Sequence, residues 1–143
     1  MSSTTDPHEF YQLLCDSTEF SSELGKMTLA VGRLEATLKS FLIKAGIRTN
    51  LKKDTLGLLA ARLANYNDMR SDELSLLNEI RTQRNYLTHN LYSLISNQID
   101  EGSITGIGLL PLDVGAYIIN TKALVEHIDV FIDILDRKLQ ELP

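Results

Sequence analysis

The 143-residue chain has one cysteine and no long apolar run. The single Cys15 excludes a framework of internal disulfides, and its place on an apolar helix face beside Leu14 predicts a buried, inert thiol. No apolar stretch reaches the roughly 20 residues that a membrane-spanning helix needs. Residues 1–7 lack the basic-then-apolar pattern of a secretory signal. We therefore expect a cytoplasmic protein with a single domain over residues 1–143.

Positive charge is also scarce, because the net charge at neutral pH is −5. This balance excludes a broad, non-specific DNA-binding face. The basic residues are unevenly distributed, however. Between residues 44 and 84, eight basic side chains outnumber five acidic ones, so this segment carries +3 and the remainder −8. The distribution allows a local positive groove around the second and third predicted helices.

Several common classes of site are missing from the sequence. Three histidines and one cysteine do not make a zinc site, and His8 and His127 are interpreted as incidental. The glycines of residues 102–108 lack the preceding strand and the Lys-Ser/Thr of a phosphate-binding loop. The acidic residues 126–136 are interpreted as a solvated helix face. We therefore predict no metal and no cofactor.

The spacing of apolar residues predicts helices almost throughout. Asp6-Pro7 is a helix start signal, and Gly25 and Gly32 inside the first helix suggest a bend, or a break near Ser21-Ser22. Residues 99–111 are interpreted as a loop or a small hairpin. The predicted helices span residues 9–45, 54 or 55 to 66, 71–97 and 113–142. This pattern predicts an all-α bundle of four to five helices, two of them long and antiparallel.

The helix over residues 71–97 carries the most informative residues. Ser71 is a suitable N-cap, and no glycine or proline interrupts the span. One apolar stripe contains Leu77, Ile80, Leu87, Leu91 and Leu94. Arg84 falls in the middle of this stripe, where a charged group must find a partner or extend to solvent. Glu35 on the first helix is a candidate partner for Arg84.

A polar stripe runs beside the apolar one. Asn85 and His89 are four residues apart and share a helix face. Arg81 lies four residues before Asn85, and Tyr92 lies three after His89. Arg84 and His89 diverge by about 140° around one helix, so they can meet at one ligand only from two edges of a groove or across a two-fold axis.

The order Arg84-Asn85-x-x-x-His89, inside the third long helix of a short helical chain, resembles the signature of the HEPN superfamily. The segment Thr55-Leu56-Gly57 is also similar to one that precedes the motif in some branches. Many HEPN proteins are ribonuclease toxins or effectors of bacterial defence and stress systems. The resemblance covers most of the chain at the level of helix order, but its specific part is these few residues.

The resemblance implies a metal-independent endoribonuclease of toxin–antitoxin or phage-defence type. Attack of the RNA 2′-OH on the adjacent phosphate would leave a 2′,3′-cyclic phosphate. His89 would be general acid or base, Arg84 would neutralise the phosphate, and Asn85 would orient His89 or bind a phosphate oxygen. Arg81 and Tyr92 would contact the RNA substrate. A composite site in a homodimer would supply the second histidine that the chemistry requires.

One residue departs from the family pattern. Some HEPN toxins have a tyrosine two residues after the histidine, which a partner antitoxin modifies. Leu91 holds that position here, and the tyrosine follows at Tyr92. We therefore expect a cognate antitoxin, but the sequence does not support its control of the toxin by modification of this tyrosine. The alternative is a non-catalytic helical interaction module or small regulator, antitoxin-like or similar to the mannitol-operon repressor family. In that case Arg84 is a structural ion pair and His89 a surface residue. A third possibility, a HEPN fold that binds nucleotides without cleaving, lies between the two.

Overall fold

The computed structural model describes residues 6–50, 52–96 and 111–143. Within these residues the chain forms helices and no strand, as the apolar spacing predicts. The five helices are α1 (Pro7–Asp16), α2 (Thr18–Lys44), α3 (Leu56–Leu63), α4 (Ser71–Ser96) and α5 (Val114–Glu141). The prediction of an all-α bundle is confirmed. Residues 99–110, interpreted from sequence as most of a loop or hairpin, lie outside the described part of the chain.

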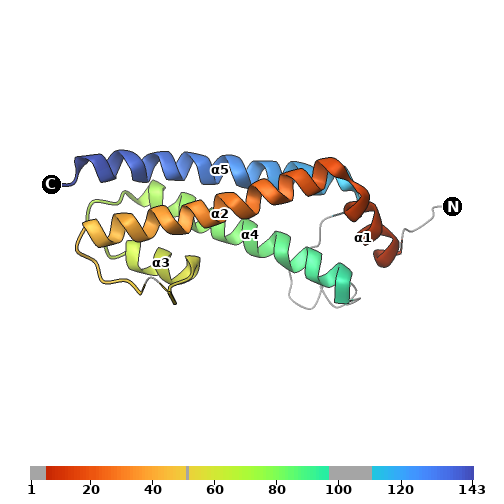
Figure 1. Cartoon of the computed structure of the whole chain (residues 1–143), viewed down its shortest axis with the longest axis horizontal. Helices are drawn as coiled ribbons and strands as arrows, with labels where there is room; N and C mark the ends of the chain where they lie inside the picture. The colour runs from red at the N-terminus through yellow and green to blue at the C-terminus, as the bar shows by residue number, and fades with distance from the viewer. Residues whose placement is uncertain (1–5, 51, 97–110) are drawn as a thin grey trace.

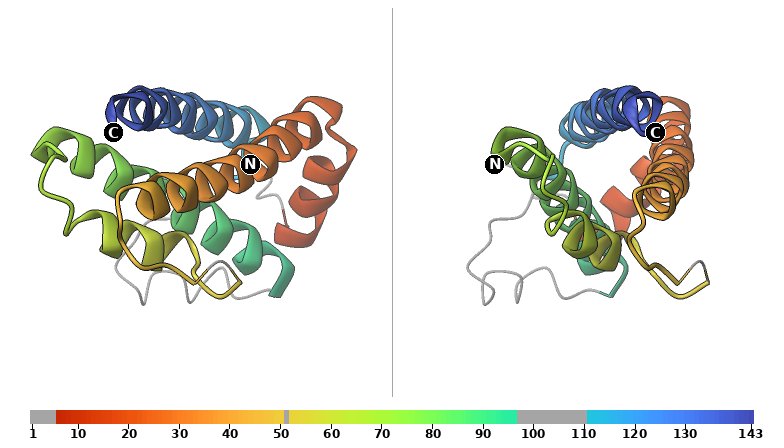
Figure 2. Two further views of the ribbon diagram at one scale, coloured as in Figure 1. Left: turned by 60° about the vertical axis from the view of Figure 1, so that its left-hand side comes forward. Right: turned by 90° about the vertical axis from the view of Figure 1, so that its left-hand side faces the viewer.

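The three long helices α2, α4 and α5 surround a common interior (Figures 1 and 2). Helices α2 and α5 run in the same direction, because Lys122 near the start of α5 pairs with Glu19 near the start of α2 at 3.3 Å. At the other end, Lys44 Nζ lies 3.4 Å from the carbonyl oxygen of Leu139. Helix α4 is antiparallel to both of them. The two long antiparallel helices that pack against each other are therefore α4 and α5.

The first predicted helix is in fact two helices, which meet at Ser17 rather than near Ser21-Ser22. The Ser17 side-chain oxygen accepts a hydrogen bond from the Phe20 N–H at 3.0 Å. The Ser17 N–H in turn donates to the Leu14 carbonyl oxygen at 3.1 Å. One residue therefore ends α1 and caps α2. The break lets α1 fold back against α4 (Figure 2).

The core combines apolar side chains from all five helices. At one end, the ring of Tyr117 in α5 lies 5.4 Å from that of Phe10 in α1 and 6.0 Å from that of Phe20 in α2. Phe10 and Leu14 form the buried face of α1. Cys15, predicted to be buried, is exposed. The reason is that Cys15 follows Leu14 directly, about 100° around the helix from the buried face.

The connection between α2 and α3 is tightly hydrogen-bonded. Gly46 has a φ of +82°, the left-handed conformation that ends a helix most easily when no Cβ is present. The Asp54 carboxylate accepts the Asn50 N–H at 2.8 Å and, across the connection, the Arg62 Nε–H at 2.7 Å. Together these contacts hold α3 beside α4 and α2 (Figure 1).

Candidate functional site

Helix α4 presents the predicted catalytic residues from its second half. It is continuous from Ser71 to Ser96 and packs against α1, α3 and α5. The side chains of Arg84 and His89 are partly buried, whereas Asn85 is exposed. The half-buried position of Arg84 agrees with its place in the apolar stripe. The three residues therefore lie at the border between the bundle interior and solvent.

Arg84 contacts Asn85 directly. Its Nη2 donates to the Asn85 side-chain oxygen at 3.4 Å, which is a long hydrogen bond. Its Nε is buried and has no hydrogen-bond partner. A guanidinium nitrogen that is removed from water without a partner is unfavourable for folding. The Arg84 guanidinium therefore has an N–H group that forms no hydrogen bond within the described part of the fold.

His89 has the same property. Its Nε2 is buried without a hydrogen-bond partner. Across the described residues, three buried side-chain polar atoms lack a partner, and the third is Thr49 Oγ1. Two of these three atoms thus belong to the pair that the sequence singled out. Unsatisfied buried groups are rare in folded proteins, and each needs a physical explanation.

Glu35 is not the partner of Arg84. Its Oε2 accepts the Leu56 N–H at 3.2 Å, at the first residue of α3. Because the first N–H groups of a helix have no intrahelical acceptor, this carboxylate stabilises the start of α3. Over residues 6–50, 52–96 and 111–143, no carboxylate forms an ion pair with Arg84. The structure therefore does not support the predicted ion pair between Arg84 and Glu35.

The two predicted substrate-binding residues differ in their surroundings. Arg81 is partly buried and lies against α3, where a methyl group added to Gly57 would lie 3.4 Å from Arg81 Nη2. The Arg81 guanidinium therefore lies next to the first turn of α3. The Tyr92 side chain is 58% exposed. It projects from α4 in the half that also carries His89, so it is accessible to a ligand.

One histidine has a larger structural role than the sequence indicated. His127 on α5 lies with its Nδ1 2.9 Å from the side-chain oxygen of Gln83 on α4. Since that amide oxygen only accepts, His127 donates from Nδ1. Gln83 directly precedes Arg84 in the sequence. The sequence pattern of α4 alone does not show which residue of another helix lies opposite Gln83. This contact fixes α5 against α4 immediately beside the motif.

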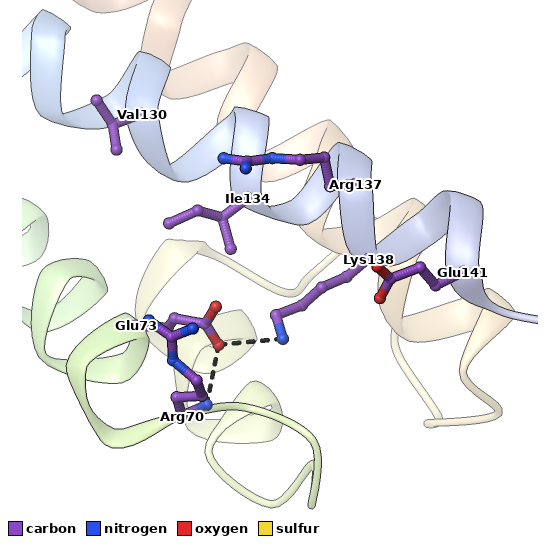
Figure 3. Close-up of a pocket in the computed structure, with 7 residues that line it drawn as sticks. All are labelled: Arg70, Glu73, Val130, Ile134, Arg137, Lys138 and Glu141. Carbon is purple, nitrogen blue, oxygen red and sulfur yellow. Dashed lines mark hydrogen bonds and ion pairs between the residues drawn. The ribbon is translucent and has the colours of Figure 1, made fainter.

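A hollow of about 470 Å³ lies between the first turn of α4 and the last turns of α5 (Figure 3). Two of its three cations, Arg70 and Lys138, are paired with carboxylates, and Arg137 Nε donates to the Asp133 carbonyl oxygen at 3.3 Å. Lys138 Nζ lies 3.1 Å from Glu73 Oε1, which also accepts the Arg70 N–H at 2.9 Å. The Arg70 guanidinium contacts the Asp72 carboxylate at 2.7 Å. We interpret this cluster as a structural clamp between the two helices rather than as a ligand site.

The described residues show no group of three or more His, Cys, Asp or Glu side chains suited to a metal ion. None of the helices seen there has the length and apolar character required to cross a bilayer. No protein-family model, curated protein or solved structure matches this chain. The function must therefore be argued from the site itself.

Proposed function

We propose that the protein is a metal-independent endoribonuclease whose site contains Arg84, Asn85 and His89. The observation that supports it best is the pair of buried, unpartnered nitrogens on Arg84 and His89. Leaving these two nitrogens without hydrogen bonds does not stabilise the fold. We therefore infer that a bound ligand forms the missing hydrogen bonds. A phosphodiester accepts hydrogen bonds from a guanidinium, and an imidazole can exchange a proton near neutral pH with the attacking or the leaving ribose oxygen.

The chemistry follows from these groups. The ribose 2′-oxygen attacks phosphorus and loses its proton to a general base, while the bond from phosphorus to the 5′-oxygen breaks and that oxygen gains a proton. The products are a 2′,3′-cyclic phosphate and a free 5′-hydroxyl. His89 transfers one of these protons. Arg84 neutralises the charge that develops on the phosphate oxygens, and Asn85 positions the guanidinium through their hydrogen bond.

Two proton transfers require two groups, and a second copy of the chain supplies the second histidine. Asn85, Thr88 and Tyr92 are all exposed on α4, so this surface is available for a homodimer contact. In the dimer, His89 of each copy faces one cleft, and Arg81 and Tyr92 border it. Tyr92 then stacks on a base, an interaction that tolerates any base. We place this activity in a toxin–antitoxin or phage-defence system of the cytoplasm, in which a cognate antitoxin restrains it.

The test is incubation of the purified protein with total RNA in EDTA. We expect wild type to cleave, and Arg84→Ala and His89→Ala each to lose on the order of 100-fold or more in rate. Arg33→Ala and His8→Ala are matched controls, because both parent residues are exposed and lie outside α4, on α2 and α1. Cleavage products are analysed for cyclic-phosphate ends.

The outcomes separate the proposal from its alternative. Cleavage that persists in Arg84→Ala and His89→Ala would assign the activity to a contaminant. Intact RNA with folded wild-type protein would favour a non-catalytic interaction module, for which the net charge of −5 and the exposed Tyr92 are the supporting observations. A monomer in sedimentation equilibrium at micromolar concentration would contradict the composite site.

A further inference from the structure

A second hollow, of about 530 Å³, opens beside the α2–α3 connection. The described residues that line it are Arg48, Thr49, Asn50, Lys52 and Arg62, and none of these five carries a carboxylate. This lining is unusual in a chain of net charge −5. The hollow between α4 and α5 differs, because the carboxylates of Glu73 and Glu141 line it together with its cations. The volume lies within the usual range of small-molecule sites.

The connection that forms this hollow is ordered by its own hydrogen bonds. The Asn50 side-chain oxygen accepts the N–H groups of Lys52 and Lys53, each at 3.1 Å. The Asp54 N–H donates to the Asn50 carbonyl oxygen at 2.9 Å, and the Asp54 carboxylate accepts the Asn50 N–H at 2.8 Å. These reciprocal bonds hold Asn50 against Lys52, Lys53 and Asp54.

Arg62 is held in place from behind. The nearly buried Asp54 carboxylate binds it at two points, with Arg62 Nε at 2.7 Å and Nη2 at 3.2 Å. Because of this contact the pKa of the Asp54 carboxyl is lowered from its usual value, and the group stays ionised. The Arg62 side chain nevertheless remains 38% exposed. Asp54 therefore orients the guanidinium while leaving part of it open to the hollow.

The Asn50 side chain is used within the connection, whereas those of Arg48, Lys52 and Thr49 have no hydrogen bond or ion pair to another described residue. Among the residues that the structure describes, no carboxylate forms an ion pair with Arg48 or Lys52. Thr49 Oγ1 is the third buried atom without a hydrogen-bond partner. Two unpaired cations, an oriented guanidinium and a spare hydroxyl are suited to a compact anion with several acceptor oxygens.

We propose that this hollow binds a phosphate group, carried by a mononucleotide or by an RNA strand. Inorganic or organic phosphate offers the multiple acceptor oxygens that the lining can satisfy. Among the described residues of the lining there is no aromatic side chain on which a base could stack. The site therefore recognises the phosphate and not the base. It is separate from the Arg84–His89 site and does not depend on that site being catalytic.

The experiment is a titration of the full chain, followed by amide NMR shifts, with three probes: inorganic phosphate, adenosine monophosphate and a short 2′-O-methyl uridine oligomer, which has no 2′-OH to attack its phosphates. We expect saturable shifts in the residues around the hollow. Arg48→Ala should weaken binding about tenfold or more, the usual effect of losing a charge-assisted hydrogen bond. Thr49→Val should weaken it less while keeping the side-chain shape. The probe that binds most tightly identifies the source of the phosphate.

Lys53→Ala is the matched control, because Lys53 is an exposed cation of the same connection that does not line the hollow. We expect Lys53→Ala to bind as wild type within about twofold. If Lys53→Ala and Arg48→Ala weakened binding equally, binding would depend only on the overall positive charge of the connection, and the proposal would be overturned. So would the absence of saturation with all three probes. Because the NMR shifts are followed residue by residue, changes around the hollow are distinguished from changes at α4, which keeps this outcome distinct from that of the RNA cleavage assay.

Discussion

At the scale of single residues, two arginines of this protein make a useful contrast. Arg62 and Arg84 are both partly buried on the bundle surface. Arg62 donates twice to Asp54, so its guanidinium has a carboxylate partner within the fold. Arg84 makes one long hydrogen bond to Asn85 and leaves its Nε unsatisfied. Residues that serve a ligand are expected to reduce stability in this way, because their partners arrive only on binding.

This contrast predicts opposite effects of one substitution at the two positions. Arg84→Met should raise the free energy of unfolding by about 1 kcal/mol, since it removes an unsatisfied buried donor and keeps the apolar stem. Arg62→Met should lower it, because Asp54 then loses its partner. Urea denaturation at neutral pH measures both. A loss of stability in Arg84→Met like that in Arg62→Met would identify Arg84 as a structural residue.

At the scale of secondary-structure elements, Ser17 decides where α1 ends and α2 begins. The apolar positions continue through this point at helical spacing, which is why the sequence predicted one long helix. The Ser17 hydroxyl competes with the helix by accepting the Phe20 N–H. Because of this turn, α1 packs across the bundle against α4 instead of extending α2 into solvent.

Ser17→Ala should therefore lower the free energy of unfolding by about 1 kcal/mol, the usual effect of losing a side-chain N-cap. Ser22→Ala is the control, because Ser22 is exposed within α2 and alanine is the better helix former. We expect Ser22→Ala to be neutral or slightly stabilising. If instead Ser22→Ala were the more damaging change, the break in the helix would lie where the sequence first suggested. Thermal unfolding followed by circular dichroism distinguishes these results.

At the scale of the whole molecule, sequence periodicity correctly predicted features that depend only on the spacing of residues along one helix, such as which side chains are buried. It assigned Leu77, Ile80 and Leu87 to the core, and all three are buried. It failed where the partner comes from elsewhere in the chain. Glu35 binds the start of α3, and His127 meets Gln83, because helix packing brings together residues 21 and 44 positions apart. The cationic hollow likewise forms only when the α2–α3 connection folds beside Arg62.

The convergence of four helices around Tyr117 can be tested through pH. Tyr117 is buried against Phe10 and Phe20, and this burial, with a smaller effect of Tyr86, raises its pKa from 10.0 to about 12. The folded state therefore resists ionisation that the unfolded chain undergoes freely. Its contribution to stability is fully present below pH 10 and is lost as the pH rises toward about 12.

We expect wild-type stability to fall through this alkaline range by roughly 2 to 3 kcal/mol more than that of Tyr117→Phe, which has no phenol to ionise. Urea denaturation of both proteins at a series of pH values from neutral upward measures the difference. All lysines and the other tyrosines are common to the two proteins, so their titration cancels in the comparison. Parallel stability profiles would mean that the Tyr117 hydroxyl is solvated, and that the helices do not close around it as the packing with Phe10 and Phe20 requires.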